Sequence, residues 1–196
     1  MKYFTADLHI GHANIIKYCD RPFLKDGKPD IHRMKQQLID NFRNVIKPGD
    51  ELYILGDLSF DLDEALSFLN WVPGQKFIVW GNHDPRKTKD RAVLQKECVK
   101  TGDILETTLA SGKQVVMCHY PMLRWNKAHF GSFMLHGHTH GNCKYPQNMR
   151  ILDVGVDNEF VLHPKYFPVS EEEINRYMKT VPWIEHHYFD ESKRET

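Results

Sequence analysis

Five short polar segments of the sequence contain side chains that commonly bind divalent metal ions. Each follows a run that reads as a β-strand, and the five are Asp7-Leu8-His9, Gly56-Asp57, Gly81-Asn82-His83-Asp84, His119 and Gly137-His138-Thr139-His140. Carboxylate, amide oxygen and imidazole form a hard-to-borderline donor set, which suits manganese, iron, zinc and related ions. In an extended segment alternate side chains share a face, so each D-x-H or H-x-H pair can chelate one ion.

Taken alone, each segment reads more readily as a polar turn or a surface histidine. The prediction of a site therefore depends on their convergence. Asp57 is suited to bridge two cations, because a carboxylate has two oxygens and a charge that offsets the repulsion between them. The glycines at positions 56, 81 and 137 let the backbone turn sharply and let an ion or a phosphate approach closely.

Strand-like and helix-like runs alternate along the chain, which predicts an α/β sandwich. The polar segments follow predicted strands, and in open α/β sheets the ligand crevice lies beyond the carboxyl ends of the strands. Strands are expected at 2–6, 51–55, 76–80, 104–110, 114–118, 132–136 and 150–156, with a hairpin turn at 111–113. Helices are expected at 12–18, 30–47, 61–72 and 86–100 and from Ser170 onward, and residues 21–29 read as a loop.

The chain length and composition indicate one globular domain over residues 1–196, with a C-terminal helix and polar tail at 170–196. The 26 basic residues balance the 26 acidic ones, so net charge does not favour nucleic acid or an anionic membrane. Four scattered cysteines fit reduced thiols in a cytoplasm. No signal peptide or membrane span is apparent, and a cytoplasmic location is expected.

The ordered set D-x-H, G-D, G-N-H-D, H and G-H-x-H, from residue 7 to residue 140, resembles the calcineurin-like metallophosphoesterase superfamily. The stretch from Gly11 to Ile16 and on through Arg21-Pro22-Phe23 is also similar to a compact bacterial and phage branch of it. The resemblance implies the calcineurin-like phosphoesterase fold, an α+β sandwich of two packed β-sheets flanked by helices.

The resemblance further implies two divalent metal ions that share Asp57. The manganese ion is favoured, with iron, zinc, nickel and cobalt as alternatives. His83 matches the catalytic histidine of the superfamily, and Asp84 matches the carboxylate that orients it. The ligands of one ion would be Asp7, His9, Asp57 and His140, and those of the other Asp57, Asn82, His119 and His138.

The expected reaction is hydrolysis of a phosphate ester by in-line attack of a metal-bridging hydroxide, with His83 assisting the leaving group. A phosphodiester is slightly favoured as substrate over a monoester, and a nucleotide is one candidate. His12, Arg21 and Arg124 are candidate substrate contacts, since an anionic phosphate needs donors beyond the metals. A solvated or surface-paired role is the commoner fate of such side chains.

Three other functions stay open at this stage. The chain could be a catalytically silent module that binds metal and docks a partner, or a phosphomonoesterase acting on a small metabolite or nucleotide. It could also be a nucleic-acid-binding protein, which would need a local basic patch that the net charge does not indicate. The intact His83-Asp84 pair favours the enzyme.

Overall fold

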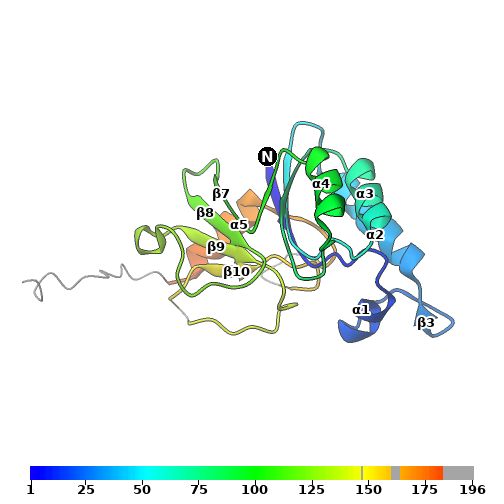
Figure 1. Ribbon diagram of the computed structural model, residues 1–196. Helices are drawn as coiled ribbons and strands as arrows, with labels where there is room; N and C mark the ends of the chain where they lie inside the picture. Colours follow the sequence, from blue (N-terminus) through cyan, green and yellow to red (C-terminus); the bar gives the residue numbers. More distant parts are fainter. Residues whose placement is uncertain (147, 160–163, 183–196) are drawn as a thin grey trace, which may run out of the picture.

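Two β-sheets form the centre of the computed structural model (Figure 1). It describes residues 1–146, 148–159 and 164–182, and the polar tail expected after residue 182 lies outside these ranges. The first sheet has the strand order β11-β1-β4-β5-β6 and the second β10-β9-β8-β7. The strands of the two sheets are β1 (Lys2–Thr5), β4 (Glu51–Leu55), β5 (Gln75–Val79), β6 (Lys100–Gly102), β7 (Ile104–Thr108), β8 (Gln114–Cys118), β9 (Phe133–His136), β10 (Ile151–Asp153) and β11 (Val169–Ser170).

Alternate side chains of β4 enter two different hydrophobic clusters, as the period of a strand requires. Tyr53 and Leu55 join a buried cluster that also contains Met117 of β8 and Leu135 of β9, so the two sheets pack face to face. Leu52 and Ile54 point to the opposite face of the first sheet and join the hydrophobic cluster beneath the helices. The strand is therefore apolar on both faces, which is the pattern of a buried parallel strand.

Three of the described helices cover the outer face of the first sheet. In Figure 1, α2, α3 and α4 lie beside the first sheet, opposite β7–β10. The outer face of the second sheet packs instead against loop residues such as Met122, Trp125 and Met149. Ile174 and Met178 of α5 belong to the cluster between the two sheets. The helices are α1 (Ala13–Tyr18), α2 (Ile31–Val45), α3 (Leu62–Trp71), α4 (Thr88–Lys96) and α5 (Glu171–Thr180), with a 3-10 helix, η1 (Ala128–Phe130).

The helix starts follow the capping residues in the sequence. Asp61 accepts a hydrogen bond from the Glu64 backbone at the start of α3, and Ser170 forms a full capping box with Glu173 at the start of α5. The spacing of Asp61 and Glu64 resembles a capping box, of which only the Asp61 half is formed. The Glu64 carboxylate pairs instead with Lys35 of α2 at 2.7 Å.

Two segments differ from the expected elements. The helix expected over 86–100 ends at Lys96, and Lys100 begins β6, which pairs in parallel with β5. This pairing satisfies backbone groups at the edge of β5, which outweighs helix continuation. The loop expected at 21–29 contains a small hairpin, β2 (Leu24–Lys25) and β3 (Lys28–Pro29), turning at Asp26-Gly27. Both turn residues have positive φ, as a D-G hairpin turn requires.

The fold brings the carboxyl ends of six strands to one edge. β1, β4 and β5 run parallel in the first sheet, and β8, β9 and β10 run parallel in the second. A bridge between Ala6 and Gly155 joins the two sheets at this edge. The segments that follow these strands contain the predicted metal ligands, so strand topology alone gathers them.

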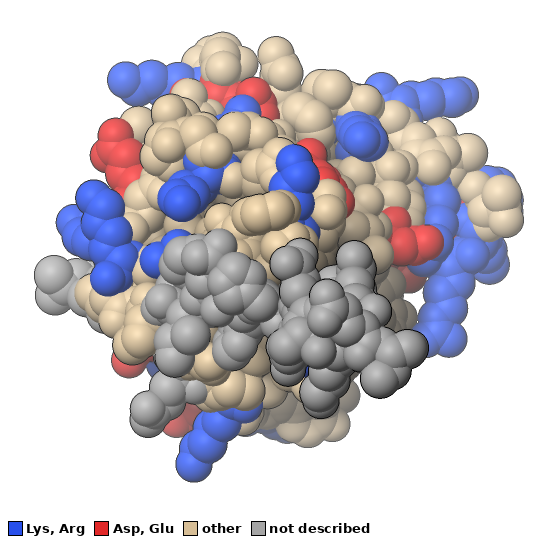
Figure 2. Space-filling model, turned by 90° about the vertical axis from the view of Figure 1, so that its left-hand side faces the viewer, with Lys and Arg blue, Asp and Glu red and all other residues tan. Residues whose placement is uncertain are grey.

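Charged side chains are spread over the surface. On the face in Figure 2, the lysine and arginine side chains of the described residues form separate groups, with acidic and uncharged residues between them. Within the described ranges, no helix is long and apolar enough to cross a membrane.

Candidate metal centre

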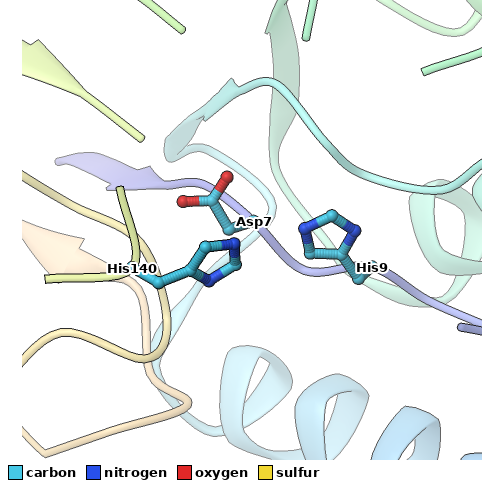
Figure 3. A group of neighbouring side chains, drawn as sticks. All are labelled: Asp7, His9 and His140. Atoms are coloured by element: carbon cyan, nitrogen blue, oxygen red, sulfur yellow. The ribbon is translucent and has the colours of Figure 1, made fainter. Parts of the chain in front are cut away.

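The described part of the chain has three groups of potential metal ligands at this edge of the sheets. One consists of Cys19, His140 and Asp157, and the other two, the first and second clusters, consist of predicted ligands. Asp7 and His9 follow β1, and His140 reaches them from the loop after β9 (Figure 3). The ligand atoms of these three side chains lie within 4.8 Å of one another. The ligand atoms of Asp57, His119 and His138 form a second cluster with the same spread. Each cluster thus brings together three of the four side chains that the resemblance implies for one ion.

Asp57, a member of the second cluster, also faces the first. Its Oδ2 is 3.6 Å from His9 Nε2 in the first cluster, and its Oδ1 is 3.4 Å from His119 Nε2 in the second. Asn82 Oδ1 lies 3.0 Å from His119 Nε2, which places the predicted amide ligand beside the second cluster. One carboxylate therefore presents one oxygen to each cluster, as a bridging ligand would.

Several residues of the two clusters have a positive backbone φ angle, which residues other than glycine rarely adopt. Left-handed φ angles are uncommon outside glycine, and where they persist at functional sites the surrounding structure holds them. Among the residues described, nine other than glycine have positive φ, and five of these are predicted ligands. These five are Asp7 (57°), His9 (50°), Asp57 (56°), His138 (70°) and His140 (47°).

Gly56, directly before Asp57, has a positive φ of 87° and stands against the second cluster. A Cβ there would lie 2.5 Å from His119 Nδ1 and 2.8 Å from the backbone of Gly81. Gly112 is a matched control, because its φ is 78° and a Cβ there would meet nothing within 4 Å. We expect Gly56→Ala to lower the free energy of unfolding by about 1–3 kcal/mol more than Gly112→Ala does, measured by urea titration. Equal losses would show that φ alone sets the cost.

His9 has two buried ring nitrogens without a hydrogen-bond partner, although the residue is only 2% exposed. Orphaned buried polar atoms are rare in proteins and call for an explanation. Burial lowers the pKa of His9 to about 3, so the ring is neutral and can offer a lone pair to a metal ion. The environment of His9 therefore fits a metal ligand.

Other buried groups hold the ligands in place. Asp7 accepts hydrogen bonds from the His138 backbone at 3.0 and 2.8 Å, and burial raises the pKa of Asp7 to about 7. The Leu55 carbonyl lies 2.9 Å from His119 Nδ1. Asp157 Oδ2 lies 2.8 Å from His140 Nδ1. Burial pulls the pKa of His140 down, but this hydrogen bond to Asp157 and other contacts raise it overall to about 10. Such outer partners fix ring orientation in metal sites.

His83, the expected catalytic histidine, borders the first cluster. Its ring centroid lies 5.4 Å from that of His9 and 4.6 Å from that of Phe60. Its backbone N–H, rather than its side chain, donates to Asp57 Oδ1 at 2.8 Å. The side chain is half-buried and takes no part in holding the second cluster.

Asp84 differs from its predicted role. Its buried carboxylate accepts hydrogen bonds from the backbone of Asp57 (3.1 Å), Leu58 (2.8 Å) and Gly81 (2.7 Å), and burial raises its pKa. The structure records no hydrogen bond between this described side chain and the His83 ring. Asp84 instead ties the loop after β4 to the loop after β5. It positions Asp57 and Asn82, because both follow those strands directly.

Of the three predicted substrate contacts, Arg21 is wrong. It is 1% exposed, and its Nε and Nη2 each donate to an Asp157 oxygen at 2.7 Å. The same guanidinium donates to the carbonyls of Leu8 (2.9 Å) and Asp7 (2.7 Å), so it braces the first cluster from behind. A buried arginine with these partners cannot reach a substrate.

The other two predicted contacts differ from each other in position. His12 lies beside the first cluster, with its ring centroid 5.7 Å from that of His9 and 5.0 Å from that of Phe60. Arg124 is exposed on the loop between β8 and η1.

The sequence analysis missed several residues that support the centre. Asp157 pairs with both Arg21 and His140, and Cys19 Sγ lies 3.4 Å from His140 Nδ1. Asp153 binds Thr139 Oγ1 at 2.6 Å and the Gly141 backbone at 2.9 Å, which fixes the loop between His138 and His140. The place of the two aspartates in the chain could have indicated this role. Asp153 ends β10 and Asp157 follows it, so both lie at the same edge as the predicted ligands.

The proteins to which this chain is similar have names that state no activity. No family model matches the sequence. "Gene 66 protein" of Mycobacterium phage D29 is 30% identical over 181 residues, covering 79% of this chain and 87% of the phage protein. The crystal structure of AQ665, a protein of unknown function from Aquifex aeolicus, has a TM-score of 0.65 and 26% identity, covering 90% of this chain and 98% of that one.

An archaeal relative extends the match to most of both chains. "Uncharacterized protein MJ1445" of Methanocaldococcus jannaschii is 30% identical over 174 residues, which cover 86% of this chain and 85% of the archaeal one. The chain therefore belongs to the same protein family as MJ1445.

Proposed function

We propose that this chain is a binuclear metal-dependent phosphoesterase of the calcineurin-like superfamily, with the fold of that superfamily. The observation that carries the proposal is the position of Asp57. One of its oxygens faces the cluster of Asp7, His9 and His140, and the other faces the cluster with His119. A carboxylate between two sets of imidazole and carboxylate donors is an arrangement that suits a pair of cations.

The donor sets fit divalent ions of the manganese, iron and zinc type. Each cluster combines imidazole with carboxylate, and neither includes a thiolate. The unpartnered buried nitrogens of His9 support the same assignment. When bound, two such cations lower the pKa of a water molecule and neutralise charge on the phosphoryl oxygens. We favour manganese as the native ion.

Different residues of the chain would have different roles in hydrolysis. Asp7, His9, Asn82, His119, His138 and His140 would bind the cations, with Asp57 shared. His83 stands at the rim of the first cluster, where its ring can donate a proton to the leaving oxygen as the ester bond to phosphorus breaks. Arg21, Asp84 and Asp157 keep the ligand loops in place. We favour a phosphodiester as the substrate.

Restoring a divalent cation to chelator-treated protein should raise its melting temperature. A ligand at 100 times its dissociation constant stabilises the native state by about 2.7 kcal/mol. For a chain of this length this corresponds to a shift of about 5–10 °C. The measurement is differential scanning calorimetry with Mn²⁺, and Mg²⁺ at equal concentration controls for ionic strength. No shift with Mn²⁺, Zn²⁺ or Fe²⁺ would contradict a metal centre.

His83→Ala should reduce hydrolysis of a chromogenic phosphodiester by about 10²- to 10⁴-fold, the usual contribution of a general acid. The Mn²⁺-induced melting shift should persist, because only the His83 backbone contacts Asp57. His32→Ala is the control, since His32 is exposed on α2. If the wild type shows the melting shift but cleaves neither a diester nor a monoester, the chain is a silent metal-binding module.

A further inference from the structure

Phe60 is a half-exposed aromatic side chain next to the proposed acid. It lies on the loop between β4 and α3 and is 50% exposed. Its ring centroid lies 4.6 Å from that of His83 and 5.0 Å from that of His12, both in edge-to-face geometry. Its contact with His9 is tilted, at 6.4 Å between ring centroids, so none of these three contacts is stacked. Half of the Phe60 surface is therefore an apolar area exposed at the rim of the first cluster.

The loop that presents Phe60 is firmly anchored, although its tip is exposed. Leu58 and Ser59 are buried on its N-terminal side. Ser59 Oγ donates to the Ile10 carbonyl at 2.8 Å and accepts from the Asp61 backbone at 3.1 Å. The Leu58 carbonyl accepts from the Ile10 backbone at 2.9 Å. The backbone that presents Phe60 is thus held before any ligand binds, which limits the entropy cost of a stacking contact.

We propose that Phe60 is a specificity-determining residue that selects phosphate esters whose leaving group carries an aromatic ring. The inference rests on the proposed function, because it takes His83 as the group at the leaving oxygen. A leaving group bonded to that oxygen lies next to His83, and Phe60 is the exposed apolar surface in contact with His83. Aromatic groups stack on an aromatic face more favourably than saturated rings of similar size.

The test compares binding of two phosphonates that cannot be hydrolysed as esters, phenylphosphonate and cyclohexylphosphonate, to Mn²⁺-loaded protein by calorimetry. Phe60→Leu keeps an apolar side chain without the aromatic face. Phe130→Leu is the matched control, because Phe130 is 65% exposed and its ring packs on His129 rather than on a site histidine. We expect the wild type and Phe130→Leu to prefer the phenyl compound by about 2- to 10-fold. Phe60→Leu should show no preference.

Equal affinity of the wild type for both compounds, a preference that survives Phe60→Leu, or binding of neither compound overturns the inference. A parallel assay of phenyl methyl phosphate hydrolysis separates this result from the proposed function. Preference without turnover contradicts the phosphoesterase and leaves Phe60 as a binding determinant. Turnover without preference supports the phosphoesterase and contradicts the role of Phe60.

Discussion

Asp57→Asn is expected to abolish tight binding of both cations and to lower hydrolysis by more than His83→Ala does. The carboxylate presents one oxygen to each cluster, at 3.6 Å from His9 Nε2 and 3.4 Å from His119 Nε2. An amide keeps one neutral oxygen and turns an N–H₂ donor toward the other cluster, and it removes the charge that offsets cation repulsion. Mn²⁺ titration calorimetry should report a stoichiometry near two for the wild type and loss of tight binding for the variant.

Two further variants make this comparison specific. Asp103→Asn controls for the loss of one negative charge, because Asp103 is exposed and belongs to neither cluster. Asp7→Asn should weaken one cation site more than the other, since Asp7 lies in the first cluster alone. Asp57→Asn that still binds two Mn²⁺ ions with wild-type affinity would contradict the bridging role.

Arg21→Met is expected to lower the free energy of unfolding by about 3–5 kcal/mol, the usual cost of removing one partner of a buried ion pair. The guanidinium binds both oxygens of Asp157 and the carbonyls of Asp7 and Leu8. Without it, the buried Asp157 charge loses its main partner. Its pKa, which burial raises but His140 and Arg21 hold at about 2, should rise. Urea titration of chelator-treated protein measures the loss without a contribution from metal.

Arg33→Met controls for loss of an arginine, because Arg33 is exposed on α2, and its effect should stay within about 0.5 kcal/mol. Adding Asp157→Asn to Arg21→Met should recover part of the stability, because no buried carboxylate is then left unpaired. A stable Arg21→Met variant whose only defect is a raised KM would instead support a direct contact with substrate.

The sequence indicates which side chains come together, because strand topology gathers them. Asp7, Asp57 and Asn82 follow parallel strands of one sheet, and His119 and His138 follow parallel strands of the other. Short apolar runs mark those strands, and each polar segment begins where a run ends. The location of a site at the carboxyl ends of strands can therefore be predicted from the order of the strands, which local sequence patterns indicate.

Tertiary partners could not be predicted in the same way. Arg21 has the composition of a phosphate contact, and only its burial against Asp157, 136 residues away, shows otherwise. Asp84 follows His83 directly, yet its carboxylate turns to backbone amides of the loop after β4. Helix propensity alone extends α4 to residue 100, because it takes no account of tertiary contacts. The pairing of β6 with the edge of β5 is such a contact, and it ends the helix earlier.

Anomalous diffraction from crystals grown with Mn²⁺ tests the binuclear centre most directly. The account predicts two anomalous peaks on opposite sides of the Asp57 carboxylate, one beside Asp7, His9 and His140 and the other beside His119 and His138. A single peak would contradict it. So would a peak only in the neighbouring group of Cys19, His140 and Asp157, which could also hold an ion.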